Sequence, residues 1–168
     1  MKNSLLEERY KFISAEDKAF ILAFEDEVSY LGYGSGGKID NGFCWGKYMI
    51  VYIKTGVKNK QVLARIYIRE NSIILRLYLN KIDEHREYIE NAKHFIKEVF
   101  TGDHGNCHHC HNDKGGICKF RKTYTLDNTY FEKCNGITFE FWEPNIEKLQ
   151  DYMSLLKEFY PTGKKCNL

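Results

Sequence analysis

Apolar residues recur every three or four positions in three segments of the chain, which predicts three amphipathic helices. The first covers residues 14–31, where Ser14 is placed to cap the helix and Gly32 to end it. The second covers residues 83–100 and starts with acidic side chains, which suit the positive end of a helix dipole. The third covers residues 144–160 and begins at a proline.

Between the first two helices, the pattern changes to an alternation of apolar and polar residues, which is typical of half-buried strands. Three such segments follow one another: residues 45–54, 62–69 and 73–79. Short polar stretches join them, so we expect an antiparallel meander over residues 45–79. Further along, two short alternating segments flank Asp127-Asn128 as a hairpin, and residues 137–142 give a last strand. The sequence therefore predicts an α+β fold, with an antiparallel sheet of about five to six strands and helices packed on one face.

The length of 168 residues predicts a single domain over residues 1–168. Hydrophobic residues make up 43% of the chain and aromatic residues 15%, which is enough for a substantial core. The net charge is only +2, so the sequence lacks the basic excess of a dedicated nucleic-acid-binding protein. No apolar run is long enough for a signal peptide or a membrane span, which predicts a cytoplasmic protein with reduced thiols.

The most specific chemical signal is a group of cysteines at Cys107, Cys110, Cys118 and Cys134. The spacing Cys107-x2-Cys110 lets one tight turn present two sulfurs, as in zinc knuckles. The other two follow within reach, one of them at the end of the predicted hairpin. We therefore expect these four cysteines to bind a structural zinc ion and to fix a metal loop and hairpin over residues 102–134.

Histidines stand among these cysteines, at His104, His108, His109 and His111. The sequence leaves open whether one of them replaces a sulfur ligand. A histidine ligand beside an open coordination position would make a catalytic site, which is the basis for an alternative, hydrolase-like zinc metalloenzyme. The simpler interpretation is that the histidines are solvent-facing loop residues.

Other cofactors fit parts of the same pattern. Residues 107–111 spell the attachment motif of c-type haem, but that attachment occurs outside the cytosol. An iron–sulfur cluster also takes four thiolates. A thioredoxin-type redox pair would need a βαβ unit, which the predicted elements do not contain. Zinc remains the expected cofactor.

Arginine and tyrosine recur along two of the predicted strands and form a candidate ligand face: Arg65, Tyr67, Arg69, Arg76 and Tyr78. Arginines spaced by two point the same way, so neighbouring strands gather cationic groups, and tyrosines add flat apolar surface. We expect this face, or a cleft beside it, to be the working surface for an anionic or aromatic ligand. An ordinary solvated sheet face is the simpler interpretation.

Three further features are weaker. The basic run at residues 119–122 contains a phenylalanine and would suit nucleic acid phosphate, although a solvated strand start explains it as well. Cys44 stands between two aromatic residues and is expected to be a buried hydrophobe rather than a nucleophile. Cys166 lies in the tail and is expected to be a free thiol.

Several segments, the cysteine motifs among them, resemble a family of uncharacterised Clostridium-type bacterial proteins: residues 42–48, 64–69, 85–90, 107–110, 118–124, 132–134 and 139–142. This resemblance spans most of the chain and implies no particular activity. More loosely, the order of helix, strands, helix, strands and helix is similar to that of the small YdhG-like α+β domains.

Taken together, these patterns predict a zinc-binding protein that acts as a non-enzymatic binding or interaction module. The alternatives are the metalloenzyme and a protein that binds nucleic acid through residues 119–122. The sequence indicates no particular substrate, partner or oligomeric state.

Overall fold

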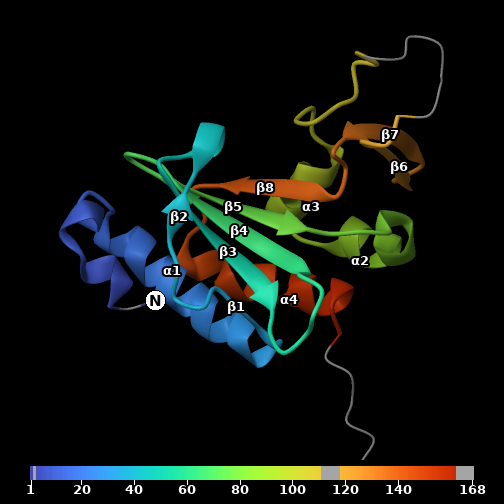
Figure 1. The fold of residues 1–168 in the computed structure, drawn as a ribbon. Helices are drawn as coiled ribbons and strands as arrows, with labels where there is room; N and C mark the ends of the chain where they lie inside the picture. The colour runs from blue at the N-terminus through green and yellow to red at the C-terminus, as the bar shows by residue number, and fades with distance from the viewer. Residues whose placement is uncertain (2, 111–117, 162–168) are drawn as a thin grey trace, which may run out of the picture. The chain divides into compact units, whose positions relative to one another are not determined.

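The structure is a computed structural model that describes residues 1, 3–110 and 118–161 (Figure 1). The chain groups into two compact units. The first unit comprises Met1–Leu77 and Glu140–Leu168, and the second comprises Tyr78–Phe139.

A six-stranded antiparallel sheet is the main feature of the fold, as predicted. Its strands run in the order β1-β3-β4-β5-β8, with β2 also paired to β3 (Figure 1). The strands are β1 Tyr33–Gly34, β2 Asp40–Asn41, β3 Tyr48–Lys54, β4 Val62–Ile68, β5 Ile73–Tyr78 and β8 Thr138–Trp142. The register pairs Ile50 of β3 with Ile66 of β4, and Ile66 with Leu75 of β5, and β5 is buried on both of its faces.

In the first unit, the helices α1 (Ala15–Tyr30) and α4 (Leu149–Phe159) lie along the same face of this sheet (Figure 1). Phe24 of α1 packs against Tyr52 of β3, with ring centroids 5.1 Å apart. Tyr152 of α4 packs edge-on against Phe141 of β8 at 4.9 Å. These aromatic contacts bury the stripe that the sequence predicts for both helices.

Caps and short helices explain where these two long helices begin. Ser14 accepts a hydrogen bond from the Asp17 amide at 3.0 Å, which caps α1. The C-terminal helix starts later than residue 144, because the Asn145 side chain caps a 3-10 turn, η5 (Ile146–Lys148), that leads into α4. Three more 3-10 turns lie in the first unit: η1 Ser4–Leu6, η2 Glu8–Tyr10 and η3 Phe43–Trp45.

The opposite face of the sheet in the first unit carries charged residues among apolar ones. Met49, Tyr67 and Ile74 are buried there as one cluster. The Arg76 Nε lies 2.7 Å from Glu140 Oε1, and both side chains are buried, at 8% and 6% exposure. Each of these buried charges needs the other, because either charge alone would be costly to keep out of water.

The second unit begins with η4 (Ile82–His85), α2 (Arg86–Asn91) and α3 (His94–Thr101). The single helix predicted over residues 83–100 is therefore wrong. The backbone of Ala92 is extended, with ψ 163°, and the new helix α3 begins at His94 after Lys93 as its N-cap. The Lys97 ammonium bonds the carbonyl oxygen of Glu90 at 3.3 Å, which satisfies one carbonyl that the interrupted helix leaves open.

A hairpin of β6 (Arg121–Leu126) and β7 (Thr129–Cys134) forms a separate two-stranded sheet in the second unit. Asp127 and Asn128 both have positive φ, which is the geometry of the predicted two-residue turn. The hairpin is fastened to the core of this unit by Tyr124, whose hydroxyl donates to the Phe100 carbonyl at 2.6 Å. Among the described residues, no helix is long and apolar enough to cross a membrane.

We expect Glu140→Leu to destabilise the protein by about 3–5 kcal/mol, because it leaves the Arg76 charge buried without its partner. The double variant Arg76→Met/Glu140→Leu removes both charges and should recover most of that loss. Urea denaturation of the three proteins measures these differences. A single variant as stable as the parent would show that the Arg76 charge does not need Glu140.

Candidate metal centre in the cysteine loop

The four predicted ligands come from three segments of the second unit that backbone pairing brings together. Cys107 and Cys110 follow α3, Cys118 precedes β6, and Cys134 ends β7. The Cys107 amide donates to the Glu132 carbonyl at 2.9 Å, so the segment after α3 runs beside β7. The Cys134 amide in turn donates to a loop carbonyl at 2.7 Å. Residues distant in the sequence thus lie next to one another at the open end of the hairpin.

A buried lysine holds this arrangement. Lys133 of β7 is only 3% exposed, and its ammonium donates to the carbonyl oxygens of Gly102 and His104 and to the side-chain oxygen of Asn106. Burial lowers the pKa of the Lys133 ammonium, and the nearby Asp103 carboxylate opposes that shift. The three acceptors offset the loss of hydration, and they draw the loop onto β7 just before the first cysteine.

Backbone N–H groups point at two of the sulfurs. The His109 amide donates to Cys107 Sγ at 3.5 Å. The amides of Phe120 and Arg121 donate to the Cys118 sulfur, which lowers the pKa of the Cys118 thiol. In both turns the sulfur accepts from the residue two positions later, so the two turns present their sulfurs in a similar way. Such contacts stabilise a thiolate, which is the form that binds metals.

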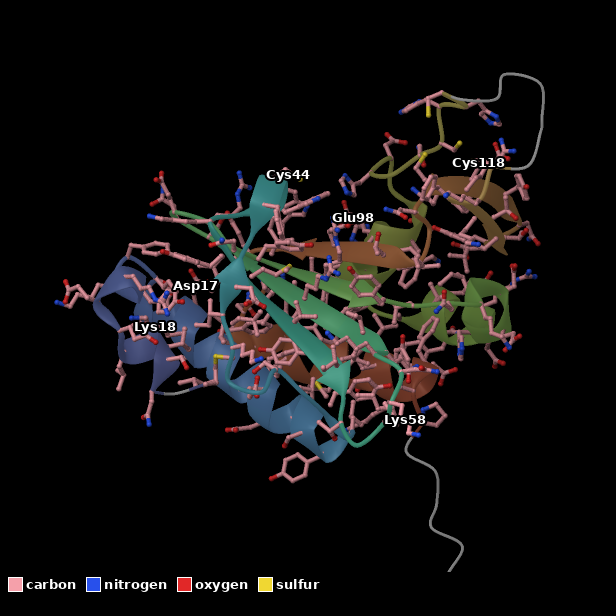
Figure 2. The ribbon with its side chains drawn as sticks, in the orientation of Figure 1. Asp17, Lys18, Cys44, Lys58, Glu98 and Cys118 are labelled. Atoms are coloured by element: carbon pink, nitrogen blue, oxygen red, sulfur yellow. The ribbon has the colours of Figure 1, made fainter. Side chains whose placement is uncertain are left out.

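Cys134 lies near the other three thiols. Burial raises the pKa of the Cys134 thiol, and a hydrogen bond with Cys107 and the charges of the three other sulfurs raise it further. Figure 2 shows sulfur atoms on the segments around the labelled Cys118. Among the described residues, however, no three histidine, cysteine, aspartate or glutamate side chains are placed so that they could hold a metal ion. The structure gathers the predicted residues, and zinc binding stays a prediction.

The histidines occupy different places around the cysteines. Both ring nitrogens of His109 are engaged: Nε2 lies 2.7 Å from Glu132 Oε2, and Nδ1 lies 2.6 Å from Arg121 Nη1. Because Arg121 only donates, Nδ1 accepts and the Nε2 proton goes to Glu132. His104 and His108 are exposed on the loop, and His111 lies outside the described residues. His109 therefore supports the turn with its backbone and ring rather than offering a free nitrogen.

The basic run at residues 119–122 does not present its cations together. Arg121 is turned toward His109, whereas the Lys119 ammonium lies over the ring of Phe120, 4.9 Å from its centroid. Phe120 itself is 53% exposed. These positions give the run no continuous positive stripe, and nucleic acid binding there stays a prediction.

The predicted ligand face belongs to the first unit except for Tyr78, and two of its residues are not at the surface. Strand register pairs Arg65 with Arg76, and the Arg65 Nη1 donates to the Tyr67 hydroxyl at 3.2 Å. Tyr67 and Arg76 are buried, at 3% and 7% exposure, and Arg76 is already paired with Glu140. Of the first-unit residues, Arg69 is exposed and stands beside an open cleft.

That cleft was not apparent from the sequence. It has a volume of about 880 Å³, and its lining combines aromatic, cationic and hydrogen-bonding side chains: Phe43, Trp45, Lys47, Arg69, Glu70, Asn71, Ser72 and Trp142. Cys44 also lines it and is exposed, so the prediction of a buried Cys44 is wrong (Figure 2). The physical reason is that residues 43–45 form the turn η3 rather than the start of β3. Cys166 lies outside the described residues.

Comparison of the chain with protein-family models, with curated proteins and with solved structures gave no match.

Lys133→Met should release the loop from β7, because methionine fills the same space and leaves three acceptors without their donor. We expect the Cys107 amide, which bonds β7, to exchange with solvent at least tenfold faster, while amides in β3 and β4 stay protected. Hydrogen exchange followed by mass spectrometry measures both regions.

Lys122→Met is the matched control, since Lys122 pairs with Lys133 across the hairpin and is exposed. Equal exchange rates at Cys107 in the parent and in Lys133→Met would contradict the role given to the Lys133 ammonium.

Proposed function

We propose that this protein is a non-enzymatic binding module in which Cys107, Cys110, Cys118 and Cys134 hold a structural zinc ion. The observation that supports the proposal is the backbone pairing of the segment after α3 with β7, and of β7 with β6, since Cys134 ends β7 and Cys118 precedes β6. The proposal requires the four side chains to converge on the ion. Zinc would supply a cross-link between the loop after α3 and the hairpin.

The chemistry of the four sulfur donors favours zinc. Four thiolates suit a soft, tetrahedral site, and the amides that face the Cys107 and Cys118 sulfurs would stabilise their negative charge. The positive charges of Lys119 and Arg121 also favour the Cys118 thiolate. Because none of the described loop residues 102–110 is buried, a metal cross-link would contribute much of the stability of the loop.

A structural role is supported over a catalytic one by the ligand count and by His109. Four sulfur ligands leave no open position on a tetrahedral zinc ion for water or substrate. The ring nitrogens of His109, the histidine inside the Cys107–Cys110 turn, are engaged by Glu132 and Arg121. A general base aimed at a metal-bound water would need one of these nitrogens free.

Reduced protein prepared without chelators should contain about one equivalent of zinc by elemental analysis. Cys118→Ser and Cys134→Ser should each lose the metal and lower the melting temperature, because serine leaves an incomplete ligand set. His104→Ala should retain the zinc. Cys44→Ser is the matched control, since Cys44 is an exposed cysteine of the first unit.

Two results would contradict this assignment. One is reduced protein that carries no zinc and takes up none when zinc is supplied. The other is loss of zinc from His104→Ala as complete as from Cys134→Ser, which would exchange a sulfur ligand for a nitrogen. Iron with visible absorption would point to a cluster instead.

A further inference from the structure

The turn at residues 42–46 holds an aromatic ring in solvent at a cost in backbone strain. Phe43 is 83% exposed and has φ 52°, a conformation that bulky residues rarely adopt. The glycines on either side lock the turn. A Cβ on Gly42 would lie 2.3 Å from the Gly46 carbonyl oxygen, and one on Gly46 would lie 2.8 Å from that of Ile68. Neither position accepts a side chain, so the turn is fixed against the end of β4.

Two indoles form the walls beside this phenylalanine, and each carries a guanidinium on its ring. The Arg76 Cζ lies 3.8 Å from the centroid of Trp45, and the Arg69 Cζ lies 5.3 Å from that of Trp142. Glu140 neutralises Arg76, as described above. Arg69 differs, because no carboxylate of the described residues lies within ion-pair distance of it. An exposed, uncompensated guanidinium next to an indole is suited to an anionic group.

The remaining lining residues define the size and polarity of a ligand. Lys47 adds a second cation, and its ammonium lies 4.9 Å from the centroid of the Phe12 ring. Glu70 is the one carboxylate among the described lining residues, so the cations outnumber it. The volume of about 880 Å³ falls in the range of small-molecule sites, roughly 300–1,000 Å³. Guanidinium groups already occupy the indole faces, which disfavours a cationic ligand such as a quaternary ammonium.

We propose that this cleft binds a planar aromatic small molecule with an anionic group, of the size of a nucleoside monophosphate. The ring of the ligand stacks against the exposed Phe43, and its anionic group pairs with Arg69, which lies over the ring of Trp142. This site lies wholly in the first unit and uses none of the cysteines assigned to zinc. It therefore stands or fails independently of the proposed metal.

The chain provides its own reporter for this cleft, since it contains two tryptophans and both line it. We expect adenosine monophosphate to change the tryptophan fluorescence, excited at about 295 nm, in a saturable way. Adenosine should bind at least tenfold more weakly, because it lacks the charge for Arg69. Inorganic phosphate should leave the emission unchanged, because it cannot stack. Arg69→Gln should lower the affinity for adenosine monophosphate at least tenfold. Its affinity should then be close to that of the parent protein for adenosine.

Arg9→Gln is the matched control, because Arg9 also lies over an aromatic ring, Tyr10 at 4.8 Å, and is outside the cleft lining. It should bind as the parent does. The proposal is overturned if adenosine monophosphate gives no saturable change up to about 10 mM. It is also overturned if Arg69→Gln binds it as the parent does, or if only a single-stranded oligonucleotide binds, since a polymer would then be the partner.

Discussion

The buried ammonium of Lys133 is the interaction on which the cysteine site depends. A lysine loses most of its hydration at 3% exposure, and such a loss is tolerated only when acceptors replace the water. The two carbonyls and the amide oxygen that serve here all belong to the segment between α3 and Cys107. Satisfying one cation therefore fixes the path of a loop that has few apolar contacts of its own. This path brings the Cys107 backbone beside β7, the strand that Cys134 ends.

The first unit also contains a buried cation, Arg76, which lies beside aromatic rings rather than sulfurs. Arg76 and Glu140 neutralise each other on one face of the sheet, and the guanidinium also supports the indole of Trp45. Trp45 and the glycine-locked turn at residues 42–46 both line the open cleft. In each unit a buried cation thus organises the groups next to it, sulfurs in one and aromatic rings in the other.

The parts of this fold that follow from local pattern were predictable, and those that depend on distant contacts were not. Short stretches of sequence are enough to predict the Ser14 cap, the turn at Asp127-Asn128 and the antiparallel sheet. The break at Ala92 was missed because the helical pattern of apolar residues continues through it. The break depends on contacts such as that of the Lys97 ammonium with the Glu90 carbonyl, which the pattern does not reveal. Hairpin pairing placed β6 and β7 outside the main sheet, which alternation alone does not reveal.

The sites show the same division. The spacing of Cys107 and Cys110 is local and was recognised, whereas the engagement of His109 by Glu132 depends on strand pairing and was not. Strand register does pair Arg65 with Arg76, but sequence alone gave no sign that Glu140 pairs with Arg76. The aromatic cleft was missed because Trp45 was assigned to a strand. The glycines at positions 42 and 46, which bracket two aromatic residues, were the available signal.

X-ray absorption at the zinc edge of the purified, reduced protein tests the metal assignment most directly, because it counts the ligand atoms around the ion. Four sulfur neighbours at about 2.3 Å are expected, with no nitrogen in the first coordination sphere. A nitrogen or oxygen neighbour at about 2.0 Å in place of a sulfur would contradict the assignment, since it would reveal a mixed site with room for catalysis.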